Sequence, residues 1–181
     1  DGVDDALATS TIILPTTNKL SAFVASKKIN STQAFQVIAE YSNDLNINVG
    51  AFAIYANSSS GANDYAIGLS ASGNNHCTLS QYQPPITNVI TALFDIGGST
   101  IDEEIVCTIN RKVPATRVNA GFVNADDGNF GSYQLYLGAR GMVLLPFYGN
   151  LYGLVICSDK KTNSVAGFVE KYLAAKSGVV F

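Results

Sequence analysis

The residues best suited to chemistry lie in the stretch TALFDIGGSTIDEEIV, residues 91–106. Asp95 precedes the pair Gly97 and Gly98, and the hydroxyl of Thr100 follows two residues later. When a strand delivers an aspartate to a tight glycine turn, the backbone N–H groups of the turn and a nearby hydroxyl can bind phosphate. This spacing therefore raises the hypothesis of a nucleotide site.

The stretch resembles the second phosphate-binding loop of the actin-like and sugar-kinase ATPases, with Asp102 at the following acidic position. The preceding residues argue against that function, because Ile86, Val89 and Ile90 fall at helical spacing directly after a proline pair. A helix there would end at Gly97, although isoleucine, threonine and valine also favour strands. No Asp-x-Gly-Thr loop precedes the stretch and no adenosine-contacting Gly-Gly motif follows it. We therefore reject nucleotide binding.

A serine and the single histidine, Ser70 and His76, suggest a second chemistry. The stretch GLSASG, residues 68–73, is similar to a nucleophile elbow, but the second glycine is replaced by serine. An elbow also requires a helix directly after the serine, whereas a polar stretch follows here. We expect a hairpin strand instead of a Ser-His site.

The three cysteines have no metal-ligand spacing, and with one histidine in the chain a structural zinc site is excluded. Cys107 and Cys157 lie in apolar runs and are expected to be buried. Cys77 lies in the polar stretch SGNNHCTLS, which we expect to form a loop, and it is our candidate for a reactive or cofactor-carrying thiol. The three consecutive acids at 102–104 are expected to point into solvent at the edge of an element and not to form a catalytic pair. The acids in NADDGNFG, residues 124–131, lack the spacing of a calcium loop and predict a turn.

The composition bounds the partners of the chain. The 181 residues are 47% hydrophobic and only 14% charged, with a net charge of −3. Nucleic acid is excluded as a partner, because the lysines and arginines form scattered pairs and phosphate binding needs a basic face. A surface with few charges is poorly protected against association. We expect the protein to be packed against neighbours in a large assembly, or to lie outside the cytosol.

The hydrophobic pattern predicts one domain, residues 1–181, with an N-terminal arm at 1–20 and a core at 21–181. We expect helices near 32–45, near 86–96 and at 162–178, where apolar residues recur with helical period. Strands are expected over NVGAFAIYA, over its hairpin partner YAIGLSA, and between residues 132 and 158. The run 142–157 is interrupted by Pro146 and is no transmembrane segment. The element order α-β-β-α-β-β-β-β-α predicts an α+β fold, a mostly antiparallel sheet with helices packed on it.

A family resemblance concerns the last forty residues. Pro146, Gly149, Gly153 and Ser158 lie in a hairpin pattern that leads into the final helix. In this the chain resembles the end of the GlcG-like, haem-associated family. The resemblance implies a profilin-like α+β fold, with an antiparallel sheet closed by a helix, and it transfers no ligand residue.

Four tyrosines gather in the C-terminal part of the chain and suggest a contact surface: Tyr133, Tyr136, Tyr148 and Tyr152. Tyrosine has a large apolar body and a polar tip, which suits a surface half buried against a partner. We therefore predict a non-catalytic structural or assembly subunit that binds other protein subunits and needs no cofactor. One alternative is a small-molecule-binding or sensory domain that holds an aromatic or tetrapyrrole ligand through Cys77. A third is an enzyme whose cleft gathers His76, Ser70 and an acid.

Overall fold

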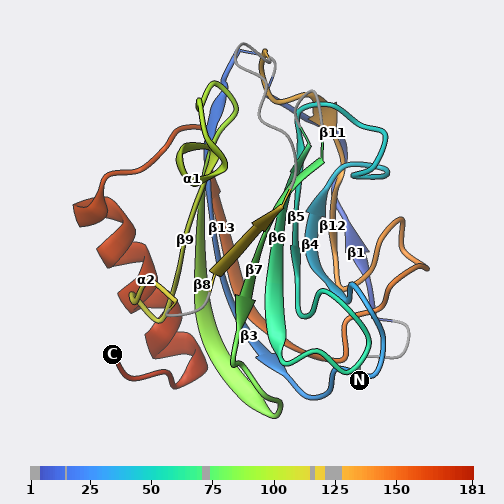
Figure 1. Cartoon of the computed structure of the whole chain (residues 1–181), viewed down its shortest axis with the longest axis vertical. Helices are drawn as coiled ribbons and strands as arrows, with labels where there is room; N and C mark the ends of the chain where they lie inside the picture. The colour runs from blue at the N-terminus through green and yellow to red at the C-terminus, as the bar shows by residue number, and fades with distance from the viewer. Residues whose placement is uncertain (1–4, 15, 71–73, 115–116, 121–127) are drawn as a thin grey trace.

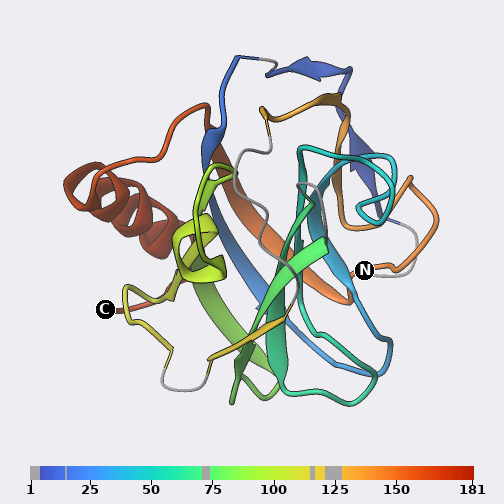
Figure 2. The ribbon, with the colours of Figure 1, turned by 45° about the horizontal axis from the view of Figure 1, so that its top comes forward.

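Two antiparallel sheets pack face to face as a β-sandwich, and one long helix covers the outside of the smaller sheet (Figure 1). The computed structural model describes residues 5–14, 16–70, 74–114, 117–120 and 128–181. In Figure 2, turned from the first view, the helix again lies outside the smaller sheet and the larger sheet lies on the opposite side. The architecture is thus helix, four-stranded sheet, seven-stranded sheet.

The larger sheet has seven strands in the order β1-β12-β4-β5-β6-β7-β10, and all neighbours are antiparallel. In sheet order the strands are β1 (Leu7–Ala8), β12 (Leu135–Leu137), β4 (Val37–Tyr41), β5 (Ala51–Tyr55), β6 (Asp64–Ser70), β7 (Asn74–Ser80) and β10 (Arg117–Ala120). The central strands β4 to β7 follow one another in the chain. Both edges are supplied by distant segments.

The smaller sheet has the order β13-β3-β8-β9, again antiparallel throughout. Its strands are β13 (Gly149–Cys157), β3 (Lys19–Lys28), β8 (Ile86–Asp95) and β9 (Ile105–Ile109). A two-stranded ribbon joins β2 (Ile12–Ile13) to β11 (Ser132–Tyr133), and a single helical turn, α1 (Ile101–Glu104), precedes β9. Within residues 1–20, the expected arm, β1 and β2 pair with strands from the C-terminal part of the chain.

The main core lies between the two sheets, and alternate residues of each strand reach it. In β5, Phe52 and Ile54 point into this core, while Ala53 and Tyr55 belong to a separate cluster on the outer face of the seven-stranded sheet. Phe52 meets Phe94 of the opposite sheet, with ring centroids 5.0 Å apart. The alternation matters for function because it leaves a second, distinct face on β5 and β6.

The long helix α2 (Asn163–Ser177) packs on the outer face of the four-stranded sheet. Its Leu173 and Ala166 meet Phe23 and Val89 in a second apolar cluster. The helix ends at Gly178, which takes the left-handed conformation with φ of 74°. The terminal helix and its glycine cap, expected from the sequence, are confirmed.

The α+β, profilin-like fold expected from the sequence is wrong: the chain is mostly β, with two packed sheets. The helix expected near 32–45 is replaced by a turn and β4, and the helix expected near 86–96 is β8. Both strands are buried on both faces over most of their length, so apolar residues fall at odd and even positions alike and imitate helical spacing. The strand preference of the isoleucine, valine and threonine in β8 decides the outcome.

The expected hairpin in the first half of the chain is confirmed, since β5 and β6 pair antiparallel from Ala51 opposite Ser70 to Tyr55 opposite Ala66. No helix among the described residues is long and apolar enough to cross a membrane.

Candidate functional site

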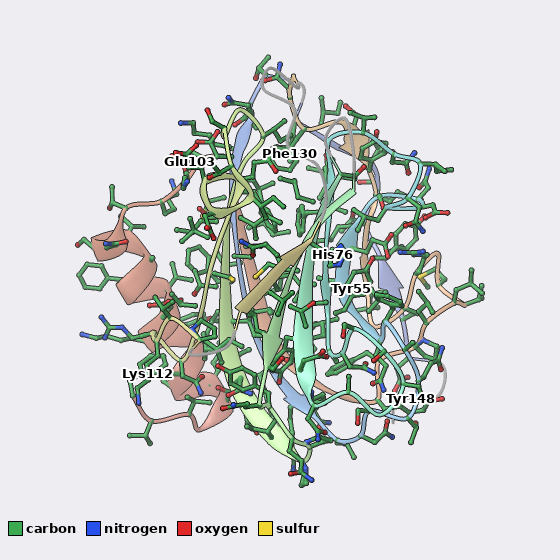
Figure 3. All side chains as sticks on the ribbon, viewed as in Figure 1. Tyr55, His76, Glu103, Lys112, Phe130 and Tyr148 are labelled. Carbon is green, nitrogen blue, oxygen red and sulfur yellow. The ribbon has the colours of Figure 1, made fainter. Side chains whose placement is uncertain are left out.

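A hollow of about 270 Å³ opens on the outer face of the seven-stranded sheet. Tyr55 and His76, both labelled in Figure 3, reach it from β5 and β7, on either side of β6. The loops before and after β4 and the segment between β12 and β13 complete its walls. The lining residues are Phe35, Leu45, Asn46, Tyr55, Ala66, Gly68, His76, Arg140 and Leu145.

The floor of the hollow exists because β5 and β6 carry small residues on this face. Ala53, Ala66 and Gly68 alternate with the large side chains that point into the main core. A Cβ atom on Gly68 would lie 2.6 Å from Cδ2 of Leu45 and 3.6 Å from Cε2 of Tyr55. A larger residue at this position would displace the side chain of Leu45, whereas Tyr55 lies at an ordinary contact distance.

One wall is aromatic and apolar. The ring of Phe35 meets the ring of Tyr55 edge to face, with centroids 5.5 Å apart, and 45% of Phe35 remains exposed. Phe35 and Leu145 have φ of 53° and 54°, a left-handed conformation that bulky residues rarely adopt. Two lining residues are thus held in costly backbone conformations, a feature that clusters at functional sites.

The other wall is polar and is organised by Arg140, whose side chain is 13% exposed. Its Nε donates to Oε2 of Glu40 at 2.9 Å and its Nη2 donates to Oη of Tyr55 at 2.9 Å. Nη1 lies 3.3 Å from Oδ1 of Asp44. Burial, together with the nearby charge of Glu40, raises the pKa of Tyr55, so its phenol stays a neutral hydroxyl. The hydroxyl accepts from Arg140 and keeps its own proton to donate.

Cys77 lies in β7 rather than in the expected loop, and its side chain is fully buried in the main core. Its Sγ is 3.5 Å from Sγ of Cys107, which comes from the opposite sheet. His76, its neighbour, points to the outer face and is exposed. Adjacent residues of a strand face opposite sides, so the two side chains do not form one site. A cofactor carried by Cys77 stays a prediction.

Ser70 and His76 lie on the two paired strands β6 and β7, but they are not directly opposite. The register places His76 opposite Gly68, and Ser70 opposite Asn74. Ser70 is buried, and no hydrogen bond joins it to His76 in the described part of the chain. Of the acidic turn expected in residues 124–131, the aspartates lie outside the described residues.

The four tyrosines come from different parts of the sandwich. Tyr133 donates to the carbonyl of Val49 at 2.7 Å, and Tyr136 donates to Oε1 of Gln134 at 2.7 Å. Tyr148 directly precedes β13, the edge strand of the four-stranded sheet, and Tyr152 lies within that strand; Figure 3 shows Tyr148 at the lower right. Their role as an interface stays a prediction.

The stretch DIGGST forms a strand-to-helix turn, but its polar groups are occupied by bonds within the turn and by an ion pair with β3. Oδ2 of Asp95 lies 3.1 Å from Nζ of Lys19. The hydroxyl of Thr100 accepts from the N–H of Glu103 at 3.3 Å, and Oε2 of Glu103 accepts from the N–H of Ser99 at 2.8 Å. The bond from Glu103 to Thr100 caps the four-residue helix at its N-terminal end, and the carboxylate of Glu103 reaches back to the residue before the cap.

The sequence reasoning missed Phe35, Tyr55 and Arg140, which line the hollow, and it missed Glu40, which holds Arg140 in place. One signal was available, because AFAIYA and YAIGLSA place small residues at alternate positions of two paired strands. Alternating small residues indicate a face that does not pack into the main core. The partners above that face come from distant segments and leave no local signal.

By sequence, the chain matches no protein-family model and no curated protein. Among solved structures it is similar to the CBM40 of the Ruminococcus gnavus IT-sialidase bound to α2,3-sialyllactose. The TM-score is 0.61 and the identity 11%, over 91% of this chain and 97% of that chain. The SAP-like pentraxin of Limulus polyphemus has a TM-score of 0.59 and 13% identity, over 96% of this chain and 74% of that chain.

Botulinum neurotoxin type C, in a study of cell entry that depends on two ganglioside molecules, has a TM-score of 0.59. Its identity is 12%, over 88% of this chain and 36% of that chain. At these identities the likeness establishes the fold, a β-sandwich of the kind found in these binding domains, and overturns the profilin-like expectation.

Proposed function

We propose that the protein is a non-catalytic sugar-binding domain, and that its site is the hollow on the outer face of the seven-stranded sheet. The observation that carries the proposal is the pairing of a half-exposed aromatic ring, Phe35, with the polar cluster of Arg140 and Tyr55. A sugar ring has apolar C–H faces and a polar rim of hydroxyls. Ligand sites combine apolar and aromatic walls with a few fixed polar groups in this way.

The compared structures support the ligand class. One is a domain bound to sialyllactose and another is a toxin that depends on gangliosides, and both are similar to this chain over most of its length. Sugar ligands are therefore the first class to test at the hollow.

The test is glycan binding measured in solution by titration calorimetry, after a glycan array has identified a ligand. We expect Phe35→Ala to weaken binding by about tenfold or more, because aromatic anchors carry much of the energy of a binding site. The matched control is Phe168→Ala, since Phe168 is also an exposed phenylalanine, 71% accessible, but lies on α2 outside the other sheet. Equal binding by both variants would place the sugar site elsewhere.

A second candidate is the assembly subunit expected from the sequence, with another protein subunit as partner. Val165, Phe168 and Tyr172 of α2 are exposed and fall at i, i+3 and i+7, so they form one apolar stripe. Native mass spectrometry of the protein from its source would test this candidate. A complex that is lost in Tyr172→Glu supports it, and a monomer at high concentration contradicts it.

A further inference from the structure

The charge of the hollow narrows the class of sugar, on the assumption that the proposed function is right. Arg140 provides the positive charge, while Glu40 and Asp44 provide two negative charges bonded to it. At neutral pH this cluster has a net charge of −1. Because two carboxylates already outweigh the single positive charge of Arg140, this arginine is a poor receptor for a further carboxylate or sulfate.

Glu40 cannot move aside to free the guanidinium. Its side chain is 0% exposed, and its Oε1 accepts from Oγ of Ser42 at 2.8 Å and from the N–H of Leu45 at 3.0 Å. The other oxygen, Oε2, accepts from Arg140. The carboxylate is thus held by three donors, and rotating it would leave a buried N–H or a buried charge without its partner.

Asp44 is also fixed in place, because it organises its own loop. Its Oδ1 accepts from the backbone N–H of Asn46 at 3.0 Å and from the side-chain amide of Asn46 at 3.1 Å. Its side chain is more open than that of Glu40 and lies 3.3 Å from the lining residue Arg140, so its negative charge repels an anion that approaches the guanidinium. The loop after β4 therefore holds the charge of Asp44 in a fixed place beside Arg140 at the edge of the hollow.

The remaining lining suits uncharged hydroxyls. Arg140 has guanidinium N–H groups beyond the three in the bonds above, Tyr55 keeps one O–H to donate, and His76 offers a ring nitrogen. Phe35 and Leu145 supply apolar surface for the C–H face of a ring.

We infer that the hollow selects uncharged sugars and discriminates against sugars that carry a carboxylate or a sulfate. The ring of the sugar lies against Phe35 and its hydroxyls point toward Arg140 and Tyr55. This specificity is opposite to that needed for sialyllactose, the ligand of one similar domain.

The experiment compares matched pairs of glycans, each neutral oligosaccharide beside its sialylated or sulfated counterpart, starting with lactose and sialyllactose. We expect the neutral member of a pair to bind about tenfold more tightly, since a unit charge near an unbalanced charge changes affinity by about this factor. Affinity for the neutral member should change by less than about twofold between 50 and 500 mM salt, because screening acts only on charges.

Two variants separate the charge argument from the proposed function. Asp44→Asn should reduce the preference for neutral over acidic glycans by about three- to tenfold. Asp159→Asn should leave the preference unchanged, because Asp159 forms a comparable ion pair with Lys161 but follows β13 on the other sheet. If the acidic glycans bind more tightly than the neutral ones, and salt weakens their binding, the inferred preference for neutral sugars is wrong but the proposed sugar site stands. Binding of no member of any pair would overturn the proposed function itself.

Discussion

Replacing Glu40 by glutamine should destabilise the protein strongly, although the change keeps the shape of the side chain. The carboxylate is fully buried and accepts from Arg140, Ser42 and the N–H of Leu45. Glutamine has one acceptor oxygen and one NH₂ group, so at least one of these donors would face another donor. The guanidinium would keep Asp44 but lose its closest counter-charge.

The size of the effect follows from this geometry. Breaking a buried ion pair by removing one partner destabilises a protein by roughly 3–5 kcal/mol. Because Arg140 keeps the bond to Tyr55 and the ion pair with Asp44, we expect the lower end, about 3 kcal/mol. That is a large part of the total stability of a typical domain, roughly 5–15 kcal/mol.

The assay is urea denaturation followed by circular dichroism and by tyrosine fluorescence, since the chain has no tryptophan. The control is Lys19→Gln, which breaks the pair between Lys19 and Asp95 at 3.1 Å with the lysine side chain 48% exposed. An exposed pair contributes less than about 1 kcal/mol. If the two variants lose the same free energy of unfolding, the Glu40 pair is not the buried anchor described above.

Three further predictions concern other parts of the molecule. Burial lowers the pKa of Lys28 to about 8, so above that pH the folded protein holds fewer protons than the unfolded chain. The free energy of unfolding, measured by urea titrations at each pH, should therefore rise by about 2 kcal/mol from pH 8 to pH 10, and Lys28→Met should abolish this rise. Gly50→Ala should lower the free energy of unfolding by more than about 2 kcal/mol, since φ is 71° and the new methyl group would overlap the carbonyl of Asn129. The control is Gly61→Ala, where φ is 77° but the space around the residue is open, and it should lose only about 1 kcal/mol in the same urea assay. Cys157 is only half-buried, so it should react with a thiol reagent before the two core cysteines do. Cys157→Ser should therefore remove the fast phase of labelling, and an unchanged fast phase would contradict the placement of these thiols.

The sequence predicts the elements that have one buried face or strong turn chemistry. In α2 the apolar residues that meet the sheet recur at helical period and Gly178 ends the helix, so both bounds could be predicted. The β5–β6 hairpin could be predicted because NSSSGAND separates two short apolar runs. Local signals sufficed in both cases.

Strands buried on both faces cannot be recognised by the same reasoning. In β8, Val89 and Leu93 meet α2 while Ile90 and Phe94 meet the seven-stranded sheet. These positions imitate i, i+1, i+4 and i+5 on a helix, although each pair faces a different layer. The choice between helix and strand depends on whether a second sheet covers the segment, and this information is in the tertiary structure and not in the local sequence.

The candidate site lies beyond local reasoning for a related reason. Glu40, Tyr55 and His76 come together only because β4, β5, β6 and β7 are neighbours in one sheet, and Arg140 arrives from a segment about a hundred residues later in the chain. The sequence singled out His76, but paired it with Ser70, which is buried and lies opposite Asn74. A residue-by-residue search for chemistry favours neighbours in sequence, whereas this hollow is built from neighbours in space.

The buried pair between Glu40 and Arg140 is best explained by the hollow that it borders. Apolar residues of similar volume often stabilise a fold as well as a buried ion pair does, or better. An ion pair that only stabilised the fold would not require a tyrosine hydroxyl, yet Arg140 contacts both Glu40 and the hydroxyl of Tyr55. The guanidinium has N–H groups beyond those in its three contacts with Glu40, Tyr55 and Asp44, and Arg140 lines the hollow. The loss of binding in Glu40→Gln should therefore exceed that in Lys19→Gln even at temperatures where both variants are fully folded.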